Sequence, residues 1–294
     1  MPELPDVTVY VERTAAKTVG HVLRALELRS AFVLRTALPP ASELVEREIV
    51  GVRRLGKRVV LEFAAQPALF LVIHLMIAGR LHWHAADRAV PRHAAAVLRF
   101  DHGALVMTEA GTRKRASLHV VQGAAALDML DPKGLEPLDC GFDEFVQRLT
   151  AANHTLKRAL TDPRTLSGIG NSYSDEILHR ARLSPLALTQ SLDTPGLHRL
   201  YEAMRSVLDE WTRRLRADSG DFPQKVTAFR EGMAVHGRYG QPCPVCGAPV
   251  QRIVYADNET NYCARCQTGG RVLADRALSR LLKASFPRDI DQLG

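Results

Sequence analysis

Two Cys-x-x-Cys pairs near the C-terminal end constrain the fold of this 294-residue chain more than any other feature. Cys243 and Cys246 form the first pair, Cys263 and Cys266 form the second, and sixteen residues separate the pairs. Two such knuckles can bring four thiolates to one tetrahedral zinc ion. Four cysteine ligands leave no open position for water, so we expect one structural Zn²⁺ per chain. Residues 253–255, between the pairs, have the pattern of a hairpin strand.

Composition and charge indicate a folded protein with a polyanionic partner. Hydrophobic residues make up 46% of the chain, and Lys and Arg exceed Asp and Glu by 39 to 32, a net charge of +7. This excess favours nucleic acid before a membrane surface. Pro2 and Glu3 replace the positive start of a signal peptide, and no apolar run is long enough to span a bilayer, so we expect no membrane partner. Five cysteines argue against a disulfide scaffold, and Cys140, apart from the others, is interpreted as buried or inert.

The first 125 residues have the pattern of one helix followed by short strands. Apolar residues beginning with Val7 and Tyr10 recur at helical spacing, which predicts a helix over 5–19. Short apolar runs separated by turn residues then predict strands over 21–28, 49–52, 58–63, 68–75, 96–100 and 104–107. Many short strands with turns between them are typical of an antiparallel sandwich or barrel. We assign this first domain to residues 1–125.

From residue 126 onward the pattern becomes helical. The segment 122–140 is rich in Gly and Pro, and we expect a linker with one short helical patch. Apolar spacing then predicts helices that begin at 142 and 156 and that cover 174–182 and 195–215. We assign the helical domain to 126–236 and the zinc finger with a C-terminal extension to 237–294. Within the extension, 274–283 has the pattern of a basic amphipathic helix.

A glycine-containing turn joins two of these predicted helices. Gly168 and Gly170 allow a close approach of the backbone, and Asn171 or Ser172 can cap the helix that follows. A glycine turn that leads into a helix N-terminus can present backbone N–H groups to a phosphate. A plain helical hairpin would have the same pattern, but the basic pair that starts at Lys157 favours DNA.

The first three residues, Met1-Pro2-Glu3, could carry covalent chemistry. A small residue after Met normally allows removal of Met1, which would make Pro2 an N-terminal secondary amine. An α-amino group titrates near pH ~8, so part of it is neutral at physiological pH. A neutral amine can attack an electrophilic carbon and form an imine, and the carboxyl group of Glu3 lies beside it for proton transfer. Alone, the three residues favour an ordinary helix start.

Together these segments resemble the Fpg/Nei family of DNA glycosylases (formamidopyrimidine-DNA glycosylase and endonuclease VIII). The resemblance runs in order over nearly the whole chain. Its motifs are the segment 1–7, Lys57 in a Gly-Lys turn, His74-Leu75 with Gly79, the turn 167–171 and the cysteine hairpin. It implies an α+β multidomain fold: a β-sandwich with a leading helix, a helix–two-turn–helix domain and a four-Cys zinc finger. It also implies that damaged double-stranded DNA lies between two lobes with the damaged nucleotide flipped out.

The resemblance implies a base-excision-repair glycosylase with AP lyase activity that acts on oxidised bases. It implies a cytoplasmic, nucleoid-associated monomer. Pro2 would be the nucleophile at the sugar C1′, Glu3 would assist opening of the sugar ring, and Lys57 would hold a phosphate beside the reacting sugar. Strand cleavage by elimination would follow base release. The other implied DNA-binding residues are His74, Lys157, Gly170, Asn171 and His236.

The sequence departs from the family pattern at four places. Ile77 stands where the family has Met, and His236 stands where it has Tyr. The usual Asp-Pro-Arg-Arg-Phe-Gly loop is replaced by residues 109–115, which contain no aromatic wedge. Asn258 stands where a finger arginine is usual. Ile77 and the 109–115 loop bear on the choice of lesion and opposite base. At Asn258, a phosphate contact near the lesion is either absent or supplied by Arg252 or Arg265.

Two other hypotheses remain open at this point. One is a non-catalytic protein that binds damaged DNA or abasic sites on the same fold, which the altered loop and Asn258 favour. The intact Pro2, Glu3 and Lys57 speak against it. The other is a zinc-ribbon protein that joins proteins, with an incidental positive charge.

Overall fold

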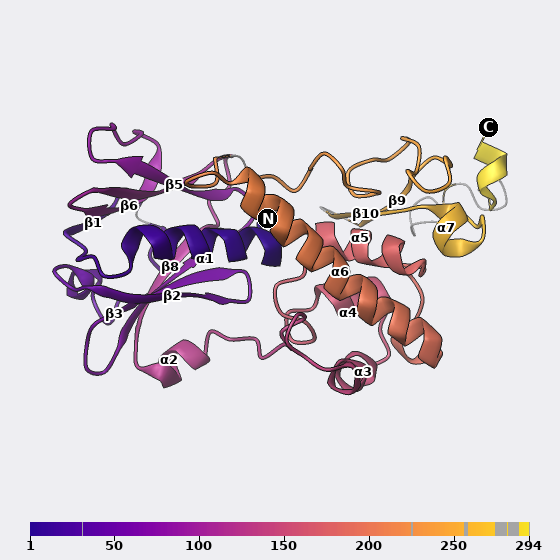
Figure 1. Ribbon diagram of the computed structural model, residues 1–294, viewed down its shortest axis with the longest axis horizontal. Helices are drawn as coiled ribbons and strands as arrows, with labels where there is room; N and C mark the ends of the chain where they lie inside the picture. The colour runs from indigo at the N-terminus through magenta and orange to yellow at the C-terminus, as the bar shows by residue number, and fades with distance from the viewer. Residues whose placement is uncertain (31, 225, 256–257, 274–280, 282–287, 294) are drawn as a thin grey trace. The chain divides into compact units, whose positions relative to one another are not determined.

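The computed structural model describes residues 1–30, 32–224, 226–255, 258–273, 281 and 288–293 (Figure 1). The chain forms two compact units. The first comprises Met1–Pro132 and Trp211–Thr227, and the second comprises Lys133–Glu210 and Ala228–Gly294. Within these described ranges, no helix has the length and apolar character needed to cross a membrane.

Two four-stranded antiparallel sheets form most of the first unit. One has the strand order β2-β3-β4-β8 and the other has the order β1-β6-β7-β5. The strands are β1 (Ala25–Leu28), β2 (Ile49–Leu55), β3 (Arg58–Phe63), β4 (Leu69–His74), β5 (Gly79–Ala85), β6 (Ala94–Phe100), β7 (Gly103–Glu109) and β8 (Ser117–Gln122). A short 3-10 helix, η1 (Ala41–Leu44), precedes β2.

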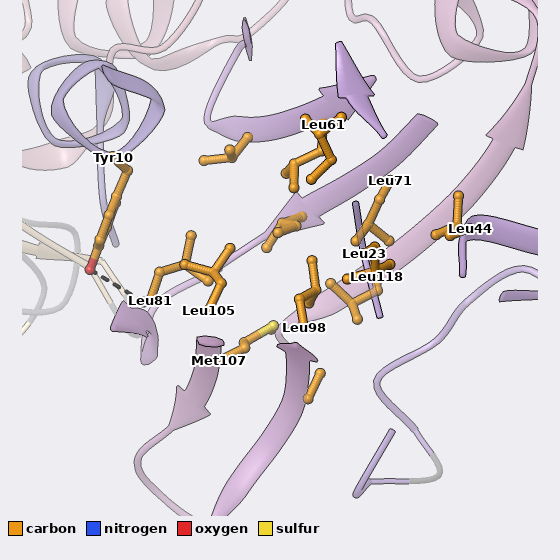
Figure 2. Close-up of a cluster of buried hydrophobic side chains, with 14 of the residues drawn as sticks. Tyr10, Leu23, Leu44, Leu61, Leu71, Leu81, Leu98, Leu105, Met107 and Leu118 are labelled. Carbon is orange, nitrogen blue, oxygen red and sulfur yellow. Dashed lines mark hydrogen bonds between the residues drawn. The ribbon is translucent and has the colours of Figure 1, made fainter. Parts of the chain in front are cut away.

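The core of the first unit lies between the two sheets. Leu61 and Leu71 come from one sheet, Leu98 and Leu105 come from the other, and each is fully buried or nearly so. Figure 2 shows these side chains pointing toward one another. Burial of one such side chain contributes about 1.5–3 kcal/mol relative to exposure. Successive side chains of a strand point to opposite faces of its sheet, so the apolar residues that face inward from both sheets pack together as a sandwich.

Helix α1 (Leu4–Thr18) packs its apolar stripe against this core. Tyr10 is completely buried, and its hydroxyl accepts a hydrogen bond from the backbone N–H of Leu81 at 3.4 Å (Figure 2). Helix α2 (Ala124–Asp128) follows β8, and its Leu127 packs with Val60 and Val72 on the outer face of the β2-β3-β4-β8 sheet.

The second unit is helical, with a small hairpin near its end. Its helices are α3 (Phe142–Thr150), α4 (Leu156–Thr161), α5 (Asn171–Ala181), η2 (Thr189–Ser191), α6 (Thr194–Asp218), whose last residues group with the first unit, α7 (Ala264–Thr268) and η4 (Ile290–Leu293). Strands β9 (Gln251–Tyr255) and β10 (Asn258–Tyr262) pair antiparallel. Helix α7 follows the hairpin, and its N-cap is Cys263, whose sulfur accepts a hydrogen bond from the N–H of Cys266.

The turn between α4 and α5 packs against the start of the second unit. Gly134 has no room for a side chain, because a Cβ there would lie 2.2 Å from the carbonyl oxygen of Pro163. The N–H of Ser167 donates to the carbonyl of Leu135 at 2.8 Å. Gly168 has a φ of 81°, which favours glycine. These contacts fix the path of the backbone into α5.

The predicted antiparallel sandwich, the leading helix and the strand over 58–63 are confirmed. Strands β5 and β8 were not predicted. The strand expected over 21–28 is limited to Ala25–Leu28, since residues 21–23 instead make isolated backbone contacts beside β2. The predicted cap of α5 was wrong: Asn171 is already helical, Gly170 is the N-cap, and no side chain caps it. The amphipathic helix expected over 274–283 falls outside the described residues, apart from Leu281.

Candidate functional site

The start of the chain is buried in the first unit. Pro2 is buried, and Glu3 is only 2% exposed at the N-cap of α1. Glu3 and Asp6 form a capping box, in which each side chain accepts a hydrogen bond from the backbone N–H of the other. The N–H of Glu3 lies 2.9 Å from Oδ2 of Asp6. Two carboxyl groups are thereby fixed one and four residues after Pro2.

Charges of both signs surround the amino group of Met1. Burial lowers its pKa below the usual value of about 8. The carboxylates of Glu3 and Asp6 oppose this shift, whereas the cations Arg80 and Lys57 add to it. Lys57, in the turn between β2 and β3, therefore acts on the amine from a different part of the unit. The net shift favours the neutral, nucleophilic form of the amine.

His74 ends β4 opposite Arg58 of β3. Burial first, and then the nearby cations Arg58 and Lys57 and the ring of His119, lower the pKa of His74 to about 4. His74 is therefore neutral at physiological pH and presents an imidazole rather than a positive charge. Lys57 acts electrostatically on both His74 and the amino group of Met1, which places the two predicted site residues and the chain start in one region.

A buried carboxylate connects two predicted DNA-binding residues of the second unit. Asp175 of α5 is fully buried and accepts a hydrogen bond from Nζ of Lys157 at 2.5 Å. Its other oxygen lies 2.8 Å from Nδ1 of His236. The ring of His236 is 6% exposed and stacks on Phe229, with centroids 5.6 Å apart. Both predicted residues thus have partners within the protein.

Helix α5 also binds the finger hairpin. Nδ2 of Asn171 donates to the carbonyl of Glu259 in β10 at 2.7 Å, and Lys157 donates to the carbonyl of Asn171 at 2.8 Å. Gly170, directly before Asn171, is the N-cap of α5. Glu176 accepts hydrogen bonds from the N–H groups of residues 234, 235 and 236 at 2.7–2.9 Å. Burial raises the pKa of Glu176, and these three donors oppose that shift.

The four predicted metal ligands lie together. The sulfurs of Cys243, Cys246, Cys263 and Cys266 all lie within 4.8 Å of one another. Two of the separations are 3.9 and 3.4 Å. A tetrahedral zinc ion with Zn–S bonds of about 2.3 Å requires sulfur separations of about 3.8 Å. The donor set and its spacing therefore fit zinc.

His179 supports this cluster from α5. Its Nε2 lies 3.3 Å from the sulfur of Cys243, and burial lowers its pKa to about 4. A neutral imidazole can donate its N–H to a thiolate, which orients a ligand from outside the coordination shell. The sequence analysis missed His179, because no local pattern connects it to a cysteine 64 residues later.

Asp6, Arg80, Asp175 and Glu176 were also missed. Asp6 could have been found, since an acidic residue three positions after Glu3 completes a capping box. The acidic pair at 175–176 follows the glycine turn directly, but its partners lie 18 to 61 residues away in sequence. Arg80 lies on the unpredicted strand β5, so nothing placed it near the chain start.

Family models match three parts of the chain. Residues 1–118 match the formamidopyrimidine-DNA glycosylase N-terminal domain, residues 133–218 match the H2TH domain of the same enzymes, and residues 240–269 match the zinc finger found in FPG and IleRS. With the fold described above, these matches define a DNA-repair glycosylase class that carries a zinc finger with four cysteine ligands.

Two relatives agree with these matches, one over most of the chain and one over about half of it. The formamidopyrimidine-DNA glycosylase of Herpetosiphon aurantiacus is 32% identical over 91% of this chain and all of that protein. A formamidopyrimidine-DNA glycosylase-like protein of Mycobacterium tuberculosis is 44% identical over 52% of this chain and 96% of that protein. The chain therefore belongs to the formamidopyrimidine-DNA glycosylase family.

Solved structures show the same fold. The MutM (Fpg) protein of Thermus thermophilus aligns with a TM-score of 0.76 at 31% identity, over 90% of this chain and 98% of that one. The Lactococcus lactis enzyme, bound to DNA containing an abasic site, aligns with a TM-score of 0.78 at 25% identity, over 90% and 99% of the two chains. The predicted fold class and family are confirmed.

The lowered pKa of His74 predicts a pH-dependent stability. An unfolded histidine titrates near pH ~6.5, so protonation below that pH favours the unfolded chain. The contribution of neutral His74 is complete above about pH 6.5 and is lost as the pH falls toward about 4. In His74→Gln, the free energy of unfolding should fall less over this range, by up to about 3 kcal/mol.

Urea unfolding of the wild type and the variant between pH 7 and 4 measures this difference. Other buried histidines contribute to both curves, so the difference between the two proteins is the quantity of interest. Parallel curves would contradict the assignment.

Proposed function

We propose that this protein is a bifunctional DNA glycosylase and AP lyase that excises oxidised bases. After removal of Met1, the secondary amine of Pro2 is the nucleophile. The observation that carries this proposal is the environment of the chain start, which is buried, fixed by the Glu3–Asp6 capping box and acted on by Lys57 and Arg80. These features favour a neutral amine and hold a carboxyl group beside it.

In the proposed reaction, the Pro2 nitrogen forms a bond to the sugar C1′ as the bond from C1′ to the damaged base breaks. The base leaves with the proton that the attacking amine releases. Glu3 donates a proton to the ring oxygen as the sugar opens, which leaves an iminium ion. The iminium makes a C2′ proton acidic, and loss of that proton expels the 3′ phosphate. Water then releases the sugar from the amine.

We propose that Lys57 and His74 contact phosphates near the lesion from the first unit. Lys157, Gly170, Asn171 and His236 serve the second unit in the same way. Because Lys157 and His236 bond to Asp175 and Asn171 bonds to Glu259, part of this role is to hold the backbone of the turn for phosphate contact. The proposed domains are residues 1–125, 126–236 and 237–294. We also propose that the protein acts in the cytoplasm, as a monomer, on double-stranded DNA.

The proline mechanism predicts a covalent complex with abasic DNA that borohydride traps. A non-cleavable N-terminal extension keeps the Pro2 nitrogen in a peptide bond, so trapping should disappear. A matched C-terminal extension should leave it intact. If burial also lowers the pKa of the Pro2 amine, trapping should rise with pH and level off below about pH 8.

Denaturing electrophoresis of labelled DNA measures the trapped fraction. Full trapping by the N-terminally extended protein would move the nucleophile elsewhere, with Lys57 as the next candidate. DNA binding without trapping by the processed wild type would favour the non-catalytic alternative.

Glu3→Gln should lose base excision far more than cleavage of a preformed abasic site. The amide can still accept the hydrogen bond at the N-cap, so α1 should fold. The abasic site already exposes an aldehyde, whereas an intact nucleoside needs the carboxyl group. We expect excision to fall by about 10²–10⁴-fold.

Single-turnover rates on lesion and abasic oligonucleotides test this division. Glu12→Gln, on the same helix, is the matched control and should keep both rates. Equal losses of the two activities in a folded Glu3→Gln protein would count against the assigned role.

We propose that one structural zinc ion binds the four cysteines. Metal analysis should find about one zinc per chain, less in Cys263→Ser and unchanged in Cys140→Ser, whose cysteine is buried elsewhere. Because the finger hairpin is short, metal loss should unfold it locally and weaken DNA binding. A zinc-free wild type, or normal DNA affinity in Cys263→Ser, would refute this role.

A further inference from the structure

A small pocket in the first unit lies outside the groups described above. It has a volume of about 240 Å³, and its lining includes Arg29, Phe32, Val33, Arg92, His93 and Lys114. We propose that this pocket binds one unpaired nucleobase together with its phosphate, as presented by single-stranded DNA. The choice of DNA as the source of the nucleotide rests on the proposed function.

The walls of the pocket are built into the sheet. The register between β6 and β7 shifts between Ala94 and Ala96, so a bulge leaves Ala95 out of the ladder. The carbonyl of Ala95 instead accepts the N–H groups of Arg29 and Ser30 at 3.0 and 3.2 Å. The turn that carries Phe32 is thereby fixed to the start of β6.

The opposite wall is the loop between β7 and β8. Buried Glu109 accepts the N–H groups of Arg115 and Ala116 at 2.7 and 2.9 Å. Lys114 donates to the carbonyl of Glu109 at 2.6 Å. Its ammonium group is therefore held at the pocket, and the buried carboxylate is satisfied by backbone donors rather than by a pocket cation.

The cations of the lining exceed its acidic groups. Arg29 pairs with Glu27, and its Nη1 donates to the carbonyl of Pro91. Arg92 and His93 are exposed, and neither has a hydrogen-bond or ion-pair partner among the residues that the structure describes. An anion at this rim would find donors that the fold has not already used.

Phe32 provides an exposed aromatic ring at the pocket. Its side chain is 73% exposed at the pocket, while Val33 beside it is 3% exposed. Aromatic rings next to unpaired cations are the usual means of binding single-stranded nucleic acid, because every base has a face that stacks. Sites for drug-sized ligands measure about 300–1,000 Å³, so this smaller volume suits a single base.

A single-stranded oligonucleotide containing 2-aminopurine is the probe for stacking. Wild-type protein should quench its fluorescence on binding. Phe32→Ala should weaken the quenched complex roughly 5- to 150-fold, which corresponds to about 1–3 kcal/mol for one stacked base. Phe32→Tyr should retain it. Leu38→Ala, an exposed apolar residue outside the lining, is the control and should behave as wild type.

A double variant tests the contribution of Arg92 and His93 to phosphate binding. Arg92→Gln with His93→Gln should weaken binding and reduce its salt dependence, since fewer counterions are released. Arg88→Gln, exposed and outside the lining, is the matched control.

A third arm uses 2-aminopurine deoxynucleoside monophosphate. Tighter binding of the oligonucleotide than of the monophosphate supports DNA as the source, because a strand adds phosphate contacts beyond the pocket. Equal affinity would overturn that choice and make the pocket a site for free nucleotides.

Equal quenching by wild type, Phe32→Ala and the double variant would overturn the pocket itself. Borohydride trapping of wild-type protein is measured separately, so failure of the proposed glycosylase reaction and failure of the pocket are distinguishable. Circular dichroism of each variant confirms the fold, which these exposed substitutions should leave intact.

Discussion

The reciprocal hydrogen bonds between Glu3 and Asp6 are the interaction on which the proposed chemistry depends. They start α1 at a fixed place, and the packing of Tyr10 into the core then fixes the helix against both sheets. As a result the end of the chain, which normally frays, is buried from Pro2 onward. Both carboxyl groups are engaged with backbone N–H groups, so their positions relative to the chain start do not depend on side-chain freedom.

The second unit has a comparable constraint in the adjacent carboxylates Asp175 and Glu176. Asp175 binds side chains from α4 and from the segment before the finger, whereas Glu176 binds three backbone N–H groups of that segment. Removing one partner of a buried ion pair typically costs about 3–5 kcal/mol, because the remaining charge stays desolvated. The glycine turn, the finger hairpin and the helix between them are therefore held together within the second unit.

The sequence was sufficient for the fold class and for the four-cysteine cluster, because both depend on local patterns. The strand over 58–63 and the two cysteine pairs were predictable from spacing alone. Strand β5 was not predictable, because polar residues such as His82 interrupt its apolar pattern. In the fold, His82 forms a hydrogen bond with Thr108 of β7, which the sequence does not reveal. The contacts of Lys157, Asn171 and His236 were equally hidden, because a distant carboxylate or carbonyl decides where each donor points. Sequence could name these residues, but only the fold shows that their donors have partners inside the protein.

The loop after β7 shows what the departure from the family pattern means physically. The loop has no aromatic wedge, but its own hydrogen bonds order it. The carboxylate of Glu109 accepts the N–H groups of Arg115 and Ala116, and Lys114 donates to the carbonyl of Glu109. Opening this loop would cost free energy, because the buried carboxylate of Glu109 would lose its hydrogen-bond donors. The loop therefore presents basic side chains from a defined backbone, and the exposed aromatic group of this edge is Phe32 on the neighbouring turn. An aromatic contact with DNA from this part of the unit would come from that turn and not from the loop that carries it elsewhere in the family.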